Sequence, residues 1–161
     1  MRPFQPYFLE DLEVGQEFET PRRTITETDL VTFAMFSSDW NAIHTDVTSV
    51  QNGQFGKRIV HGALGLTIAT GLVQRTGMFE GSAVALLGIA EWVFAKPLYV
   101  GDTVFTRLRI TEVRPTSDGR RGVIGRELKL VNQHDDVIQH GRSDFMVLRR
   151  EPAAYSAGGT D

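Results

Sequence analysis

The chain has 161 residues, of which 41% are hydrophobic, and this fits one globular domain with a single core. The formal net charge is −3 and no basic stripe runs along the sequence, so we expect no nucleic-acid binding. The chain has no cysteine, which excludes disulfides and thiolate catalysis and suits a protein of the cytoplasm.

The ends of the chain and its longest apolar run indicate no association with a membrane. Residues 1–6 lack the apolar core of a signal peptide. Residues 59–73 form an apolar run without Asp, Glu, Lys or Arg, but this run is short for a bilayer crossing. Residues 151–161 are rich in Ala, Gly and Ser, so we expect a flexible tail behind a domain of residues 1–150.

The first part of the chain predicts a short strand followed by a helix. Residues 18–25 have the pattern of a strand after a turn at 14–16. Thr26 is typical of a helix N-cap, and Asp29 follows it at the spacing of a capping box. The next residues carry apolar side chains at helical spacing, and we expect the helix to end near Ser37.

A longer helix is predicted over residues 62–74. This segment has no charged residue, and apolar or small residues occupy nearly every face, so we expect other elements to enclose it. Before it, Asp46 is suited to cap a short helix at 47–51, and glycines mark the loop that follows.

The remainder of the chain predicts long strands at 83–95, 103–114, 122–131 and 137–149. In the second of these, Val104, Leu108 and Ile110 alternate with arginines, as expected where one face of a sheet is buried. Asp118-Gly119 is a hairpin-turn signal between the second and third strands. Long strands after one enclosed helix indicate an α+β fold.

Residues 39–44, Asp-Trp-Asn-Ala-Ile-His, place a carboxylate, an amide and an imidazole in one short segment. Helix interiors disfavour Asp and Asn, because their side chains compete for nearby backbone groups, so we expect this segment to form a turn. Asp39 and His44 on one ordered turn can share a water molecule. That pair is the minimum needed to take a proton from water and deliver one to a carbon atom.

The order of residues from Phe33 to His44 resembles the motif of the MaoC-like hydratases, also called (R)-specific enoyl-CoA hydratases, which have the hotdog fold. A second block at 55–62, Phe-Gly-Lys-Arg-Ile-Val-His-Gly, also matches, and the resemblance extends over residues 8–149. Two positions depart from the family motif: Ser38 stands where glycine is usual, and Ala42 stands where proline is usual. The resemblance implies a curved antiparallel sheet wrapped around the long helix.

The resemblance also implies an activity: addition of water to a trans-2-enoyl-CoA to give the (R)-3-hydroxyacyl-CoA, or the reverse dehydration. Asp39 and His44 would activate the water, with Asn41 orienting them. The Gly62 N–H, at a helix start, would bind the thioester oxygen, because free N–H groups and the helix dipole favour negative charge there. Thr70 would hold a small polar position near the substrate.

No organic cofactor is needed for this reaction. The family resemblance implies a homodimer, or a dimer of dimers, with acyl-CoA or an acyl-carrier protein as the carrier of the substrate. Two other functions stay open: a hotdog acyl-CoA thioesterase, and a non-catalytic module that binds acyl-CoA or an acyl-carrier protein. The motif Asp-x-Asn-x-x-His argues against the thioesterase, because it belongs to the hydratases.

The same residues also suit structural roles. Asp39 and Asn41 are common turn residues, and Gly62 would also serve close packing. His61 is more readily explained as a structural histidine at a helix start than as a catalyst. Lys57 and Arg58 are more readily explained as solvated loop charges than as phosphate ligands.

Metal and serine-hydrolase chemistry are not expected. A calcium loop would need glycine and glutamate where His44 and Val50 stand, and no His-Glu-x-x-His is present. No Gly-x-Ser-x-Gly elbow is present either.

Overall fold

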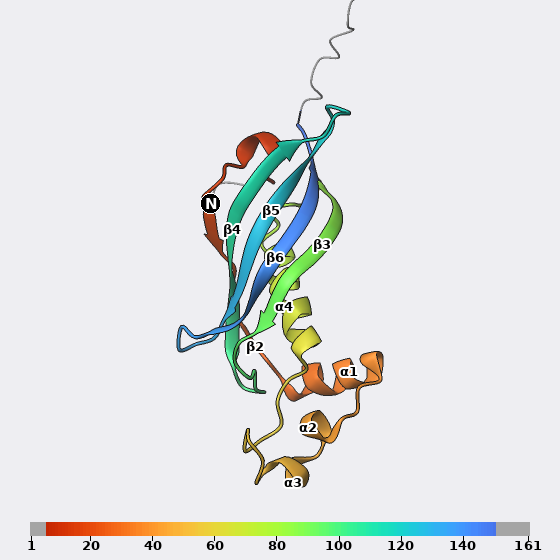
Figure 1. Ribbon diagram of the computed structural model, residues 1–161, viewed down its shortest axis with the longest axis vertical. Coiled ribbons are helices and arrows are strands. Elements are labelled where there is room, and N and C mark those ends of the chain that lie inside the picture. The colour runs from red at the N-terminus through yellow and green to blue at the C-terminus, as the bar shows by residue number, and fades with distance from the viewer. Residues whose placement is uncertain (1–5, 151–161) are drawn as a thin grey trace, which may run out of the picture.

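The computed structural model describes residues 6–150 and contains a six-stranded antiparallel sheet that curves around one long helix (Figure 1). The strands are β1 (Glu17–Glu19), β2 (Arg23–Thr24), β3 (Ala83–Phe94), β4 (Thr103–Pro115), β5 (Arg121–Val131) and β6 (Val137–Leu148). The helices are the 3-10 helix η1 (Leu9–Asp11) and the α-helices α1 (Glu27–Ser37), α2 (Ala42–Thr45), α3 (Val47–Val50) and α4 (Gly62–Arg75). The tail expected at 151–161 lies outside the described residues.

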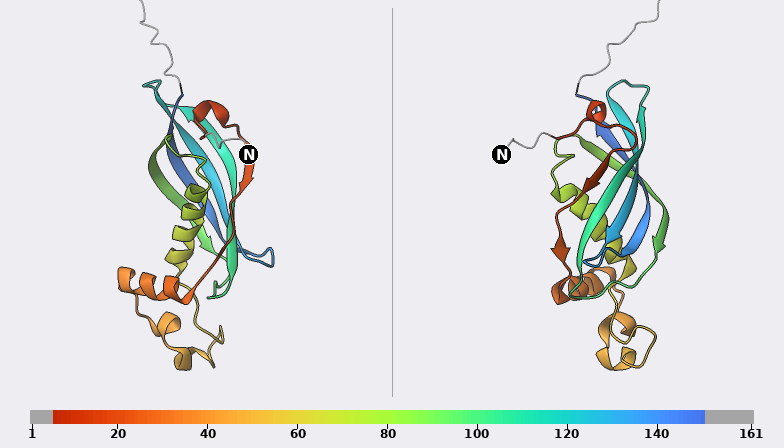
Figure 2. Two further views of the ribbon diagram at one scale, coloured as in Figure 1. Left: turned by 180° about the vertical axis from the view of Figure 1, so that it is seen from behind. Right: turned by 90° about the vertical axis from the view of Figure 1, so that its left-hand side faces the viewer.

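The strands follow the order β1-β4-β5-β6-β3, and β2 pairs with the other end of β4. The expected alternation along β4 is confirmed: Val104, Leu108 and Ile110 are buried, whereas Arg109 is exposed. Inward-facing residues of this kind pack against α4, which lies on the inner face of the sheet (Figure 2). The α+β class predicted from the sequence is therefore confirmed.

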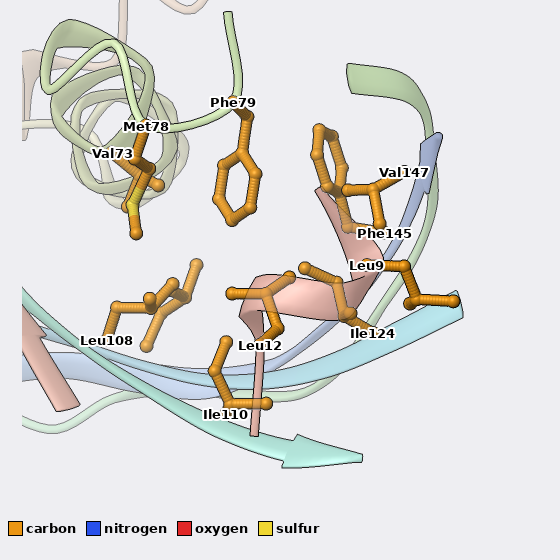
Figure 3. Close-up of a cluster of buried hydrophobic side chains, with 11 residues drawn as sticks. Leu9, Leu12, Val73, Met78, Phe79, Leu108, Ile110, Ile124, Phe145 and Val147 are labelled. Carbon is orange, nitrogen blue, oxygen red and sulfur yellow. The ribbon is translucent and has the colours of Figure 1, made fainter. Parts of the chain in front are cut away.

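The hydrophobic core consists of two clusters along α4. One lies at the C-terminal end of the helix. Here Leu9 and Leu12 pack against residues of the sheet, and the Phe79 ring lies between the helix and the strands (Figure 3). The other lies beside most of α4, and its members come from α1, α4, the sheet and the segments that connect them: Ile25, Leu30, Val60, Leu64, Ile68, Ala69, Leu72, Leu98, Val104, Leu130 and Ile138. This second cluster fixes the position of the α4 N-terminus.

The capping box predicted at the start of α1 is confirmed. The Asp29 N–H donates to Thr26 Oγ1 at 3.3 Å, and the Thr26 N–H donates to Asp29 Oδ2 at 2.8 Å. Arg23 pairs with the same carboxylate. Burial raises the pKa of Asp29, but the hydrogen bonds from Thr26 and Arg23 outweigh burial and hold this pKa below its usual value.

The strand expected at 18–25 was predicted wrongly as one element. It is two short strands, β1 and β2, with Pro21 between them. Proline has no N–H to donate to a ladder and fixes its own φ, so it interrupts the pairing with β4.

The expectation that α4 is enclosed on every side was wrong for one face. Ala63, Thr67 and Gly71 are exposed, and a Cβ added at Gly71 would meet no atom within 4 Å. The sheet of one chain covers only one side of the helix. None of the described helices combines the length and the hydropathy needed to cross a bilayer.

Strand β3 is an edge strand of the sheet, because among the described strands it pairs only with β6. Its large hydrophobic side chains are unusually open to solvent; they are Val84, Leu86, Leu87, Val93 and Phe94. Helices α1 to α3 lie beyond one end of the sheet, next to the start of α4 (Figures 1 and 2).

We expect Asp29→Asn to lower the free energy of unfolding by about 1 kcal/mol at neutral pH, because it weakens the N-terminal cap of α1. The pKa of Asp29 is lowered in the folded chain, so its carboxylate stabilises the fold above the unfolded-state pKa of about 4. That contribution is lost as the pH falls through the folded-state pKa. Urea unfolding of both proteins at about pH 7 and about pH 3 should show a difference that narrows on acidification; a constant difference would contradict this account.

Candidate active site

The chain leaves α1 through a tight reversal at Ser38, whose φ of 61° lies in the left-handed region. Glycine adopts this region most easily, which is why it is usual here in the family motif. The reversal is held by hydrogen bonds of the neighbouring serine. Ser37 Oγ donates to the Phe33 carbonyl at 2.7 Å and accepts from the Asp39 N–H at 3.3 Å.

The segment at 39–44 was expected to form a turn. The structure instead has a turn followed by helix α2, which begins at Ala42. Asn41 is the N-cap of α2, and its Oδ1 accepts from the Ile43 N–H at 3.1 Å. Ala42 is the first helical residue, a position that proline favours and alanine also suits, so this departure from the motif leaves the helix intact. The Asn41 N–H donates to Asp39 Oδ1 at 3.3 Å, so Asn41 contacts Asp39 through its backbone.

Asp39 and His44 lie close together, with 3.8 Å between Asp39 Oδ2 and His44 Nε2. The other ring nitrogen, His44 Nδ1, lies 2.7 Å from the Ile59 carbonyl. A carbonyl oxygen only accepts, so Nδ1 carries the proton and Nε2 of the neutral ring presents a lone pair. Two acceptors therefore face each other, and one water molecule can donate an O–H to each.

His61 lies directly against this pair. Its ring stacks on the His44 ring with centroids 3.8 Å apart and planes at 25°, and it also packs on Phe33. His61 Nε2 lies 2.9 Å from the Asp39 carbonyl oxygen. The side chain is buried, and among residues 6–150 its Nδ1 has no hydrogen-bond partner.

A cavity of about 630 Å³ opens beside the start of α4, and both His44 and Gly62 line it. Its wall is mostly apolar, with Phe55, Phe94 and Leu98 among the lining residues. Asp39 is not part of the wall; its carboxylate lies 3.8 Å from His44 Nε2 and is half exposed. Thr70 is not part of the wall either. Its hydroxyl donates to the Leu66 and Thr67 carbonyls of its own helix.

Gly62 is the first residue of α4, where backbone N–H groups have no partner within the helix. A Cβ added to Gly62 would lie 2.8 Å from the Phe94 ring, so only glycine fits without a shift. The Gly62 carbonyl accepts from Gln139 Nε2 at 3.1 Å, while Gln139 Oε1 accepts from Trp92 Nε1 at 3.1 Å.

Gln139 was missed in the sequence, although it lines the cavity and is buried. A signal was present, because Gln139 is a polar residue on the strand face that also carries Phe145 and Val147. Its amide lies so close to α4 that a Cβ on Gly65 would be 2.1 Å from Gln139 Nε2. Gly65 thus allows the sheet to reach the first turn of the helix.

Asp39, His44 and His61 each offer a ligand atom, and these atoms lie within 4.8 Å of one another. The two imidazole rings are stacked, however, so their lone pairs lie in nearly parallel planes and do not converge on one point. A metal ion prefers to lie in the plane of each imidazole that binds it. The arrangement fits a water site better than a metal site, and the absence of a catalytic metal stays a prediction.

An antiparallel sheet wrapped around one long helix defines a hotdog domain, and an acid–imidazole pair lies close to the start of its helix. A protein of Mycobacterium tuberculosis with a double hotdog fold matches it with a TM-score of 0.76 at 18% identity, over 97% of this chain and 48% of that chain. Residues 10–132 match the MaoC like domain family. The chain belongs to this family, and the fold and family expected from the sequence are confirmed.

Two of the relatives that are similar in sequence illustrate how much of their length the chain covers. Protein MaoC of Klebsiella aerogenes is 37% identical over 108 residues, which cover 67% of this chain and 31% of that protein. The (R)-specific enoyl-CoA hydratase of Aeromonas caviae is 30% identical over 105 residues, which cover 65% of this chain and 75% of that protein. The chain thus spans about a third of the Klebsiella protein and most of the Aeromonas enzyme.

We expect Gly65→Ala to destabilise the protein by about 1–3 kcal/mol, because the new methyl group displaces the Gln139 amide from Gly62 and Trp92. The same substitution in a Gln139→Ala background should cost little, because the obstructing side chain is gone. Chemical unfolding of the two single variants and the double variant measures this coupling. Equal effects of Gly65→Ala in both backgrounds would show that the contact is not what limits residue 65.

Proposed function

We propose that the protein is a hydro-lyase that adds water to a trans-2-enoyl-CoA to give the (R)-3-hydroxyacyl-CoA, or catalyses the reverse dehydration. The observation that carries this proposal is the 3.8 Å separation of two acceptors, Asp39 Oδ2 and His44 Nε2, of which His44 lines the cavity at the start of α4. Membership of the MaoC-like family and similarity to the Aeromonas hydratase support it.

The geometry suits the demands of the reaction. A water molecule held by Asp39 and His44 loses a proton to the pair as its oxygen attacks the β-carbon. The electrons of the double bond move toward the thioester, whose oxygen becomes negative and accepts from the Gly62 N–H. The α-carbon then receives a proton from the same pair, so the elements of one water molecule are added across the double bond.

The chemistry of each group fits the role assigned to it. His44 is fixed by its Nδ1–H bond to the Ile59 carbonyl, which leaves Nε2 free to exchange a proton. Asp39 is half exposed, so solvent can reach the pair. The apolar wall of the cavity suits an acyl chain, and no cofactor is required for these steps. CoA as the carrier, a role in fatty-acid metabolism and a cytoplasmic location stay predictions.

We expect Asp39→Asn and His44→Gln each to lower the turnover of crotonyl-CoA by about 100-fold or more, because each replaces a group that can exchange a proton with water by an amide that cannot. Loss of enoyl absorbance without release of free thiol measures hydration. Thr70→Val is the matched control and should keep near-normal rates, because the Thr70 hydroxyl donates only to its own helix.

Other outcomes would select another function. Release of free CoA would indicate a thioesterase, and binding of acyl-CoA without turnover would indicate a binding module. If Asp39→Asn and His44→Gln kept normal hydration rates, the assigned chemistry would be wrong.

We also propose that two copies of the chain pair through β3 and the open face of α4. The β3 edge has unpaired backbone groups and exposed hydrophobic side chains, and the Ala63, Thr67 and Gly71 face of α4 is small enough for close approach. The double hotdog fold of the Mycobacterium protein, of which this chain covers 48%, supports pairing of two such units.

Leu87→Glu is expected to yield a monomer, because it places a charge on the β3 edge, where Leu87 is 47% exposed in one chain. Light scattering coupled to size-exclusion chromatography measures the mass. Val14→Glu is the control: Val14 is also an exposed hydrophobic residue but lies in the turn before β1, and its substitution should leave the mass unchanged. A wild-type protein that is monomeric would rule out the pairing.

A further inference from the structure

We propose that His61 is a positioning residue for the Asp39–His44 pair, and this inference rests on the proposed hydratase function. Its Nε2–H holds the main-chain carbonyl of Asp39, and through it the distance between the carboxylate and the His44 ring. His61 thus acts through Asp39 and does not itself touch the substrate.

The hydrogen bond defines the tautomer of His61. Its Nε2 lies 2.9 Å from the Asp39 carbonyl oxygen, which only accepts, so the proton of the neutral ring is on Nε2. Nδ1 then carries a lone pair, and it is the atom that has no partner among the described residues.

His61 provides the contact that ties Asp39 to the start of α4. The other hydrogen bonds of Asp39 are local, from the Asn41 N–H to its carboxylate and from its own N–H to Ser37 Oγ. The contact with His61 instead spans 22 residues. Without it, the hydrogen bonds described for the turn that carries Asp39 reach α1 and α2 but not the start of α4.

The same short segment also holds the other member of the pair. The Ile59 carbonyl accepts from His44 Nδ1, and the Ile59 N–H donates to the Ile43 carbonyl at 3.2 Å. Asp39 is therefore anchored through His61 and His44 through Ile59. The spacing between the two catalytic groups depends on this segment, and the ring of His61 stacks on the His44 ring.

A purely structural role explains His61 less well. It occupies the N-cap position of α4, yet its side chain makes no capping hydrogen bond. A phenyl ring would fill the same space between His44 and Phe33 without burying an unpartnered nitrogen, which destabilises a fold. What histidine offers here and phenylalanine does not is the Nε2–H donor.

Two variants separate the donor from the ring. His61→Phe keeps an aromatic ring and loses the donor, whereas His61→Gln keeps an N–H donor at nearly the same distance from the backbone and loses the ring. With crotonyl-CoA we expect His61→Phe to lower kcat by about 10–100-fold with little change in KM, because a small misplacement of catalytic groups impairs the chemical step. His61→Gln should recover most of that loss.

Phe33→Leu is the matched control. It alters the other ring that packs on His61 and leaves the donor in place, so kcat should stay near the wild-type value. Normal kcat in His61→Phe, or an equal loss in His61→Phe and His61→Gln, would overturn the proposal. So would an effect confined to KM.

A measurement on the wild-type protein covers the case in which a variant fails to fold. Nitrogen-15 NMR of labelled histidines should show His61 with its proton on Nε2 and a bare Nδ1, and the opposite tautomer would overturn the proposal. This readout needs no turnover. If wild-type protein does not hydrate enoyl-CoA, the proposed function fails, while the NMR result still decides whether His61 holds Asp39 by the bond described.

Discussion

The attachment of separate chain segments to residues 59–62, at the start of α4, is the constraint on which the site depends. His61 binds the carbonyl of Asp39 from the turn after α1, Ile59 binds His44 on α2, and Gln139 of β6 binds the Gly62 carbonyl. Each of these bonds joins groups at least 15 residues apart in the sequence, and each is partly buried. Helices α1 to α3 lie beyond one end of the sheet. The position of residues 39–44 is therefore fixed by these hydrogen bonds and by the packing of Leu30 in the core.

Features encoded by local patterns could be predicted from the sequence. The capping box at Thr26, the bounds of α4 and the alternation along β4 depend on residues within a few positions of one another. The split of the first strand was also encoded locally, by Pro21, but the polar and apolar pattern around it suggested one continuous strand. The open face of α4 could not be predicted from the sequence. Apolar residues on a helix surface form the same pattern whether the same chain or a second chain covers them.

The site divides in the same way. Asp39 and His44 could be predicted as neighbours because one short motif contains both. The tautomer of each histidine depends on carbonyl groups that only the folded chain brings near, so the relation of His61 to Asp39 was hidden. Gln139 was hidden for a similar reason, because its partners lie on α4 and β3. Thr70 was carried over by resemblance, and its hydroxyl is occupied within its own helix.

Because the β3 edge is open to pairing, the stability of the fold depends on the concentration of any partner that binds this edge. Any partner that pairs with this edge binds the folded chain and not the unfolded one, so the midpoint of thermal unfolding rises with the concentration of that partner. If the partner is a second copy, dilution alone loosens the protein. A newly made chain at low concentration then exposes the apolar β3 edge, which can pair with unpaired strands of other proteins. A higher concentration of the same chain favours the dimer and so covers this edge.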